Sequence, residues 1–319
     1  MEPEVGPIQA EGLAWTFKFG DRSGSPDWDW RHFDLVNPQA RSAVQADAVL
    51  PHFARQVLSG TDESPRILTD GHGVAGVIPA YARVGNPEEY NLVCWHFAMV
   101  PSLLVTGRRH PNRTLMHAWE TANSGVHPPS PAALINNCIT EFAREVRARL
   151  SALAEDLDEI EDGLIGNRDA HRLADLGARL GRVRREATRH RRALAPLVRA
   201  LRDEAEEFPE WAQPAGHDAA ERGLNDALDD IIALQDRARS LQDELATRLT
   251  EETNRRLYIV SIVTTLVMPA TFVTGFFGMN TGGLLWGGDS VPHGTLYATS
   301  ICLFSVLLTL ALLRWKRLL

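Results

Sequence analysis

The sequence predicts an α+β membrane protein, with an N-terminal α/β domain, a long helical stalk and two C-terminal membrane helices. The run from Leu257 to Phe277 is uncharged and 21 residues long, so as a helix it can cross a hydrocarbon core of about 30 Å. A second uncharged run extends from Thr295 to Leu313. The chain before them is hydrophilic, with a mixed pattern up to about residue 128 and a helical pattern after it.

Residues 1–128 are expected to form a cytoplasmic α/β domain. Apolar residues at helical spacing follow Asn37-Pro38 and predict one helix over Gln39–Leu58. Gly71-His72-Gly73 is expected to be a hairpin turn, since no lysine follows that would make it a phosphate-binding loop. The expected strand regions are 13–19, 30–36, 66–84 and 91–106.

The pattern of residues 129–217 predicts long, charged helical arms. Pro128-Pro129-Ser130-Pro131 breaks the chain, and helices are expected over about 132–164 and 169–208. A stalk helix over 218–256 follows, and nothing between Leu249 and Leu257 interrupts it, so stalk and first membrane span are expected to be one helix. The apolar seam of the stalk consists of Leu224, Leu228, Ile231, Ala238, Leu241, Leu245 and Leu249.

The charges predict the topology and the kind of partner. Asp289 is the one acid beyond residue 256, and Arg314, Lys316 and Arg317 are the bases, so residues 1–256 hold 40 acids against 30 bases. An acidic body suits cations and argues against nucleic acid. Arg255-Arg256 before the first span and the basic tail 314–319 after the second place both ends in the cytoplasm, and the loop 281–294 outside. No cleavable signal peptide is expected at the N-terminus.

The first span, 257–280, has a polar stripe. Its hydroxyls and glycine suggest a surface that meets water or a partner helix, and helix packing through small residues explains the spacing equally well. Because two helices cannot enclose a pore, a conduction role requires an oligomer with this helix innermost. The second span, 295–313, is the better candidate to face lipid. The stripe consists of Leu257, Val260, Thr264, Met268, Thr271 and Gly275.

The end of this span carries a resemblance. Gly278-Met279-Asn280, the short loop and the final span with a basic tail resemble the CorA superfamily of divalent-cation transporters. Thr253–Tyr258 and Gly278–Gly283 are similar to its ZntB zinc-transporter branch. The resemblance implies an inner-membrane homopentamer in the lipid bilayer, with a cytoplasmic funnel and an axial pore. Asn280 would meet the incoming ion, Thr271, Met268 and Thr264 would line the pore, and Val260 and Leu257 would form the gate.

The resemblance implies divalent metal cations as cargo and no bound cofactor. The stripe lacks carboxylate, thiolate and imidazole, so it suits an ion that keeps most of its water. An outer loop with Asp289 as its one acid favours Zn2+ over Mg2+, with Mg2+ and Co2+ as the alternative and Ni2+ and Cd2+ as further cargo. Asp243 lies on the backward extension of the stripe, where it would attract or sense cations; the alternative is a solvated stalk acid.

The sequence also permits other interpretations than a cation transporter of this kind. Proton coupling would need His293, Asp289 or Asp243, because the stripe itself has no titratable group. Leu257 could instead pack between stalk helices. His72, His110, His117 and His127 match no metal-ligand spacing, and no catalytic pattern predicts an enzyme. The alternative from another class is a two-span anchored sensor or scaffold in which the stripe only packs helices.

Overall fold

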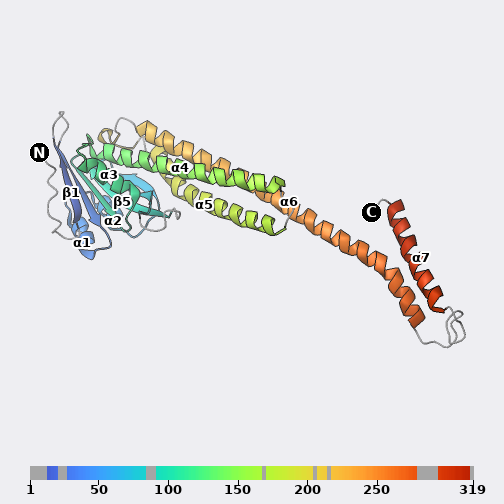
Figure 1. Cartoon of the computed structure of the whole chain (residues 1–319). Helices are drawn as coiled ribbons and strands as arrows, with labels where there is room; N and C mark the ends of the chain where they lie inside the picture. Colours follow the sequence, from blue (N-terminus) through green and yellow to red (C-terminus); the bar gives the residue numbers. More distant parts are fainter. Residues whose placement is uncertain are drawn as a thin grey trace. The chain divides into compact units, whose positions relative to one another are not determined.

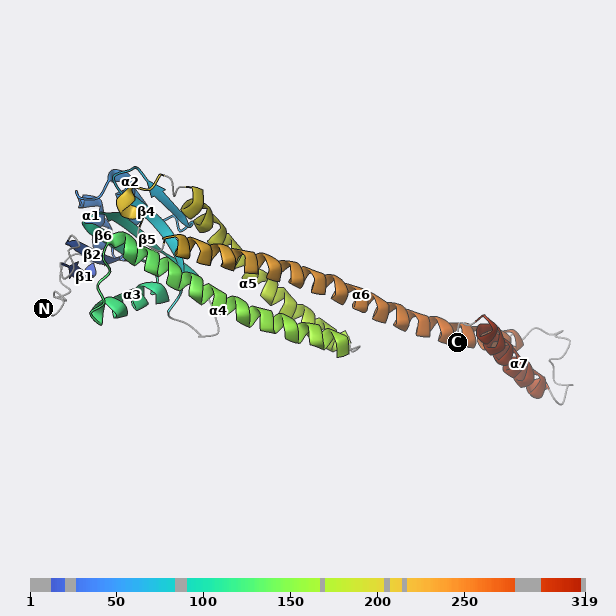
Figure 2. The same cartoon turned by 90° about the horizontal axis from the view of Figure 1, so that it is seen from above.

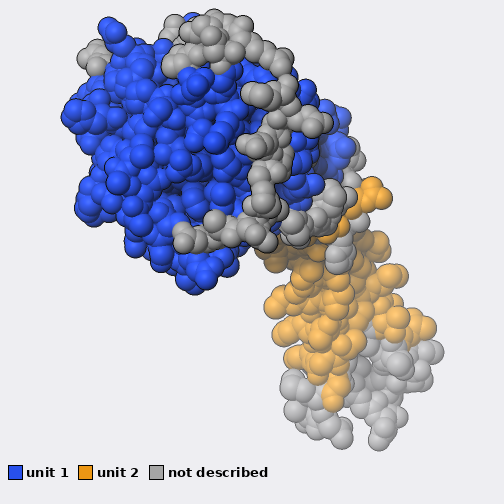
Figure 3. Space-filling model, turned by 90° about the vertical axis from the view of Figure 1, so that its left-hand side faces the viewer, with its two compact units in different colours: residues 1–165, 176–242 blue, residues 166–175, 243–319 orange. Residues whose placement is uncertain are grey.

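The computed structural model describes residues 13–20, 27–83, 91–166, 170–203, 207–213, 217–278 and 294–316 (Figure 1). The chain divides into two compact units. Unit 1 comprises residues 1–165 and 176–242, and unit 2 comprises residues 166–175 and 243–319 (Figure 3).

Unit 1 contains a six-stranded sheet with the order β1-β2-β6-β5-β4-β3. Neighbouring strands are antiparallel except β2 and β6, which are parallel. Every residue of β4 is buried, so this central strand is covered on both faces. The strands are β1 (Leu13–Phe19), β2 (Trp28–Asp34), β3 (Arg66–Thr69), β4 (Val74–Tyr81), β5 (Leu92–Val100) and β6 (Leu103–Arg108).

The predicted hairpin turn at residues 71–73 connects β3 and β4. Gly71 has φ +82°, a conformation that side chains with a Cβ rarely adopt. The carboxylate of Asp70 accepts hydrogen bonds from the backbone N–H groups of His72 at 2.9 Å and Gly73 at 3.0 Å. These bonds satisfy the turn's own backbone donors, so the loop forms a tight turn.

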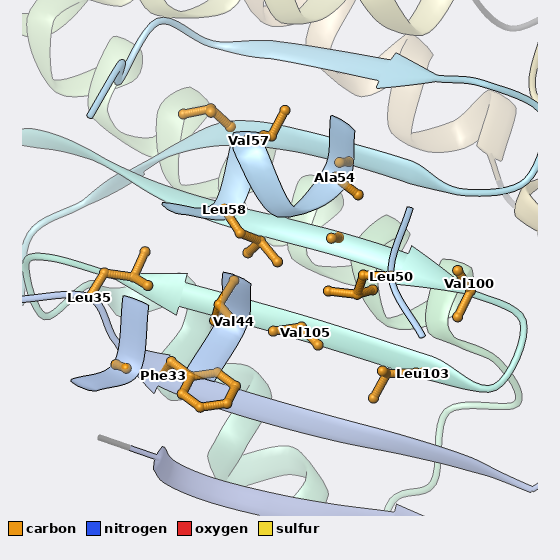
Figure 4. Close-up of a cluster of buried hydrophobic side chains, with 14 residues drawn as sticks. Phe33, Leu35, Val44, Leu50, Ala54, Val57, Leu58, Val100, Leu103 and Val105 are labelled. Atoms are coloured by element: carbon orange, nitrogen blue, oxygen red, sulfur yellow. The ribbon is translucent and has the colours of Figure 1, made fainter. Parts of the chain in front are cut away.

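One face of the sheet packs against α1 (Pro38–Ala46) and α2 (His52–Ser59) (Figure 4). The prediction of a single helix over Gln39–Leu58 is wrong. The first helix ends at Ala46, its C-cap Asp47 is extended with ψ 110°, and Pro51 is the N-cap of the second helix. Proline lacks the N–H that a continuing helix would need at this position, and the sequence contained that signal.

The opposite face of the sheet carries aromatic rings and lies toward α3 (Arg113–Asn123) (Figure 2). The indole of Trp15 lies 6.4 Å from that of Trp119 on this helix. The sequence interpretation did not include α3, although Asn112 is a normal N-cap signal. Its side-chain oxygen accepts from the N–H of Leu115 at 2.9 Å.

Three long helices follow α3 and precede the C-terminal helix. They are α4 (Pro131–Gly166), α5 (Ala170–Asp203) and α6 (His217–Gly278), and a short 3-10 helix, η1 (Glu210–Ala212), precedes the last of them. The prediction that stalk and first span form one helix is confirmed, because α6 is continuous over 62 residues. The second arm ends at Asp203, before the expected Phe208.

In unit 1 the three helices are joined by an apolar seam and by ion pairs across it. Arg149 on α4 binds both carboxylate oxygens of Glu186 on α5, at 2.5 and 2.7 Å. Arg237 on α6 pairs with Asp158 at 2.6 Å and Glu161 at 2.5 Å, both on α4. Unit 2 contains the C-terminal part of α6 and α7 (Gly294–Trp315).

Candidate functional site

The C-terminal part of α6 is the candidate functional surface. From Leu257 to Gly278 it has no charged side chain. Among the described residues, one helix portion, Ala219–Phe276, is long and apolar enough to cross a membrane, and none of its most apolar window is buried. The apolar part of α7, Thr299–Trp315, is shorter. So large an unburied apolar surface requires lipid or other protein around it.

The predicted polar stripe is exposed along its whole length. We call it the hydroxyl face. The exposed fraction is 70% for Met268, 62% for Val260 and 59% for Leu257. Packing against the described part of the chain therefore does not demand this pattern of hydroxyls and small residues. The other members of the hydroxyl face, Thr264, Thr271 and Gly275, are exposed as well.

A different face of the same helix lies against α7. Cys302 on α7 donates its thiol hydrogen to the backbone carbonyl of Ala270, with 3.7 Å between sulfur and oxygen. At about 100° per residue, this packed face is centred roughly 180° from the hydroxyl face. The hydroxyl face is thus turned away from the partner helix of its own chain. The partly buried residues of the packed face are Ile262, Leu266, Pro269, Ala270 and Val273.

α7 also has two sides. Its partly buried side includes Ser305 and Thr309, whose hydroxyls donate to the backbone carbonyls of Cys302 and Ser305, each at 2.8 Å. The hydrogen-bonding needs of these groups are thus met inside the helix. Its exposed side is mostly apolar, as a lipid-facing surface requires, and it also includes Thr299 and Ser300 near the start of the helix. The large residues there are Leu296, Tyr297, Leu303, Phe304, Leu307, Leu308 and Leu312.

The threonines of the hydroxyl face present oxygen acceptors outward. The hydroxyl of Thr264 donates to the carbonyl of Val260 at 2.8 Å, and that of Thr271 donates to Val267 at 3.1 Å. Each hydrogen is therefore used within the helix, and the oxygen lone pairs remain available. Such oxygens can accept hydrogen bonds from water around a cation, or contact a cation directly.

Pro269 shapes this surface, and the sequence interpretation did not use it. Its ring nitrogen cannot donate to the carbonyl of Thr265, so one helical hydrogen bond is missing within the apolar segment. A helix bends away from such a proline. The side opposite Pro269 contains a shallow hollow, as this bend predicts. The hollow is lined by Val263, Thr264, Val267, Met268, Thr271 and Phe272.

The backward extension of the hydroxyl face is polar and exposed. Thr250 and Thr253 donate their hydroxyls to Ala246 and Leu249, at 2.8 Å each, in the same manner as Thr264. Asp243, one further step back, is exposed and forms no ion pair with any described residue. Its carboxylate charge is therefore not neutralised within the described chain.

Other acids of α6 are neutralised by neighbouring arginines. Glu244 pairs with Arg248 at 2.6 Å, and Glu252 pairs with Arg256 at 3.1 Å. Both pairs are spaced four residues apart on the helix surface. Asp243 is thus an acid without an ion pair to a described residue, in line with the hydroxyl face, and its role in attracting cations stays a prediction.

Part of the predicted site lies outside the described residues, namely Met279, Asn280 and Asp289. Gly278 is the last described residue of α6. A Cβ added at Gly278 or Gly275 would meet no described atom within 4 Å, so packing against the described residues requires neither glycine. Among the described residues, no three His, Cys, Asp or Glu side chains gather as a metal site would require.

Comparison with known proteins assigns the family. A family model described as a CorA-like Mg2+ transporter protein matches residues 25–317. The chain belongs to the CorA family. As a member of this family, it is a divalent-cation transporter and not an enzyme. The resemblance predicted from Gly278-Met279-Asn280 and the two apolar runs is thereby confirmed.

Individual CorA-family relatives are similar over most of the chain. The zinc transport protein ZntB of Yersinia enterocolitica is 25% identical over 299 residues, which cover 90% of this chain and 86% of the relative. The divalent cation transporter CmaX of Pseudomonas aeruginosa is 25% identical over 278 residues, covering 83% and 80%. The structure of full-length CmaX matches with a TM-score of 0.75 at 22% identity, covering 98% of this chain and 99% of that one, which supports a CorA-like fold.

Proposed function

We propose that this chain forms a homopentamer in the inner membrane and conducts zinc ions through an axial pore lined by the hydroxyl face of α6. Both termini would be cytoplasmic. The observation that supports this most directly is the orientation of the hydroxyl face. It is exposed and turned about 180° from the face that packs on α7, so it remains available to a shared axis.

Each part of the pore has a proposed role. Gly278-Met279-Asn280 would form the outer entrance, where Asn280 amides hydrogen-bond the hydration shell of the ion. Thr271, Met268 and Thr264 would line the middle of the pore, beside Gly275. Leu257 and Val260 would narrow the inner part and close it by dewetting. Asp243, inside, and Asp289, in the outer loop, would raise the local cation concentration.

The chemistry of the face favours passage of a hydrated ion. It offers hydroxyl oxygens and a thioether, and no described carboxylate or imidazole that would hold dehydrated zinc. Weak binding permits throughput, since a tightly held ion leaves slowly. The ZntB relatives favour zinc as the cargo. The family model's description favours magnesium, so magnesium or cobalt transport is the second candidate.

Two adjacent threonines provide a matched test of the pore. Thr264 and Thr265 both donate their hydroxyls to the carbonyl four residues before, at 2.8 Å, but their side chains point about 100° apart. We expect Thr264→Val to lower zinc uptake into proteoliposomes by about tenfold, because a polar acceptor leaves the pore wall. Thr265→Val should leave uptake nearly unchanged. Equal losses in both variants would show that the face does not line the conduction path.

A second experiment determines cargo and coupling. Uptake of zinc, magnesium, cobalt, nickel and cadmium would be compared in the same proteoliposomes, with and without an imposed pH gradient. Zinc uptake above magnesium uptake supports the zinc assignment, and the reverse order supports the second candidate. The mass of the complex in detergent tests the pentamer independently of flux.

A further inference from the structure

The interface between α3 and α4 holds a carboxyl group that the transport pathway does not use. The Oε2 atom of Glu145, on α4, is inaccessible to solvent and has no hydrogen-bond partner among the described residues. Charged groups act on it from both helices. Glu141 and Arg144 lie on α4, and Arg113 is the first residue of α3. An unpartnered buried carboxylate is costly, and a buried carboxylic acid is much less so.

A second glutamate one helical turn away is in the opposite situation. Arg144 binds both carboxylate oxygens of Glu141, at 2.9 and 2.5 Å. That hydrogen-bonded pair lowers the pKa of Glu141, with a smaller contribution from the nearby His117. Burial, followed by repulsion from Glu141, raises the pKa of Glu145 to about 7, against the attraction of Arg113 and Arg144. The two neighbouring acids therefore differ in their state near neutral pH.

A cavity of about 380 Å3 lies between the same two helices, and it reaches along α4 to Glu141, one helical turn before Glu145. Its wall includes Glu141 and His117, together with Thr114, whose hydroxyl oxygen is buried without a partner. The space gives water, or a shifted side chain, room to solvate a charge that forms at this interface.

α4 also binds α6 two residues beyond Glu145. Arg147 donates to the carbonyl of Gly223 at 3.3 Å and to the carboxylate of Asp226 at 2.8 Å, both on α6. This contact links α4, near Glu145, to a helix that continues without a break into the apolar segment at 257–278.

We propose that Glu145 is a proton-binding site that controls how tightly α3 packs on α4, and that it makes the transporter responsive to cytoplasmic pH. A proton bound at Glu145 holds the two helices together, and its loss admits water between them. The inference goes beyond the proposed conduction path and depends on neither the cargo nor the pore residues.

The raised pKa of Glu145 determines how the stability of the fold depends on pH. A carboxyl whose pKa is higher in the folded than in the unfolded state favours folding fully at pH values below its unfolded pKa. This contribution is lost as the pH rises toward about 7, the folded-state value. Glutamine at this position stays neutral at every pH, so Glu145→Gln should remove this loss of stability at high pH.

The test uses the full-length protein in detergent. We expect Glu145→Gln to raise the apparent Tm by about 2–4 °C at pH 8 and to leave it unchanged at pH 4.5. Glu141→Gln is the matched control on the same helix face. It removes the ion pair with Arg144 and the repulsion on Glu145 but leaves Glu145 able to titrate, so the loss of Tm toward pH 8 that Glu145→Gln removes should persist.

Hydrogen exchange supplies a readout specific to this interface. After correction for the intrinsic rates, amides of residues 113–123 should exchange faster at pH 8 than at pH 6 in the wild-type protein, and at equal rates in Glu145→Gln. If Glu145→Gln has the wild-type dependence of Tm and exchange on pH, Glu145 is not the proton-binding site.

Discussion

The two ends of α6 use the same helical periodicity for opposite purposes. Between residues 217 and 242 the helix buries an apolar seam, and Ile231 and Leu224 within it are completely inaccessible. Between residues 257 and 278 it fully buries none of the side chains whose exposure is described, although it has no charged side chain there. The first part is specified by what it packs against in the chain. The second is specified by surroundings that a single chain does not supply.

The polar residues of the two parts differ in the same way. In the first part, Arg237 is paired with two acids of α4, so its charge stabilises contacts within the chain. In the second part, the polar groups are hydroxyls that bond to their own backbone and leave an acceptor outward, as Thr264 does. This difference predicts that substitutions in the first part lower stability, and that those in the second part lower transport.

The largest expected effect tests the functional end of the helix. Asn280→Ala should reduce cation uptake to the level of liposomes without protein, at least about a tenfold loss, because no other proposed pore residue offers an amide to the hydration shell. The mass of the detergent-solubilised complex should stay the same. Uptake close to that of the wild-type protein would exclude Asn280 from the entrance.

The next effect compares the two parts directly. Ile231→Ala removes a side chain that is 0% exposed and should lower stability by about 2–5 kcal/mol. Met268→Ala removes one that is 70% exposed and should change the stability of the detergent-solubilised protein by less than about 0.5 kcal/mol. Thermal unfolding of both variants measures this, and similar losses would remove the distinction between the two parts.

The sequence predicted the long elements better than the short ones. α6 was predictable because 62 residues contain apolar spacing, charge and then an uncharged run, without an early breaker. The region of α1 and α2 was mispredicted because an apolar spacing runs across Pro51, whose effect on the backbone outweighs the pattern. α3 was missed because its start signal, Asn112, precedes a helix of only 11 residues.

The candidate site was predictable as a pattern but not as an environment. Spacing placed Thr264 and Thr271 on one face, and it could not distinguish a face that packs on α7 from one turned away from it. That distinction depends on which side of the helix Cys302 approaches, a tertiary contact between residues 32 positions apart. The hollow opposite Pro269 likewise depends on backbone geometry.

A smaller effect is expected at the proposed gate. Val260→Ser places a hydroxyl on an apolar constriction and should raise the basal ion leak of proteoliposomes by about two- to fivefold, because a polar wall is harder to dewet. Ile259→Ser is the control, since Ile259 is 53% exposed but points about 140° away from the hydroxyl face. A leak that rises equally in both variants would reflect a general loosening of the helix.

The smallest expected effect concerns the electrostatic attraction of cations at the inner end of the proposed pore. Asp243 and Glu251 are both exposed acids of α6 without an ion pair to a described residue, and they lie on different faces of the helix. Asp243→Asn should change cation flux by about twofold at low ionic strength, and the change should disappear at about 1 M salt, where the Debye length is near 3 Å. Glu251→Gln should have less effect at every salt concentration. Because both variants remove one negative charge, a difference between them reports the direction in which the charge faces, and equal effects would mean that only the net charge of the stalk matters.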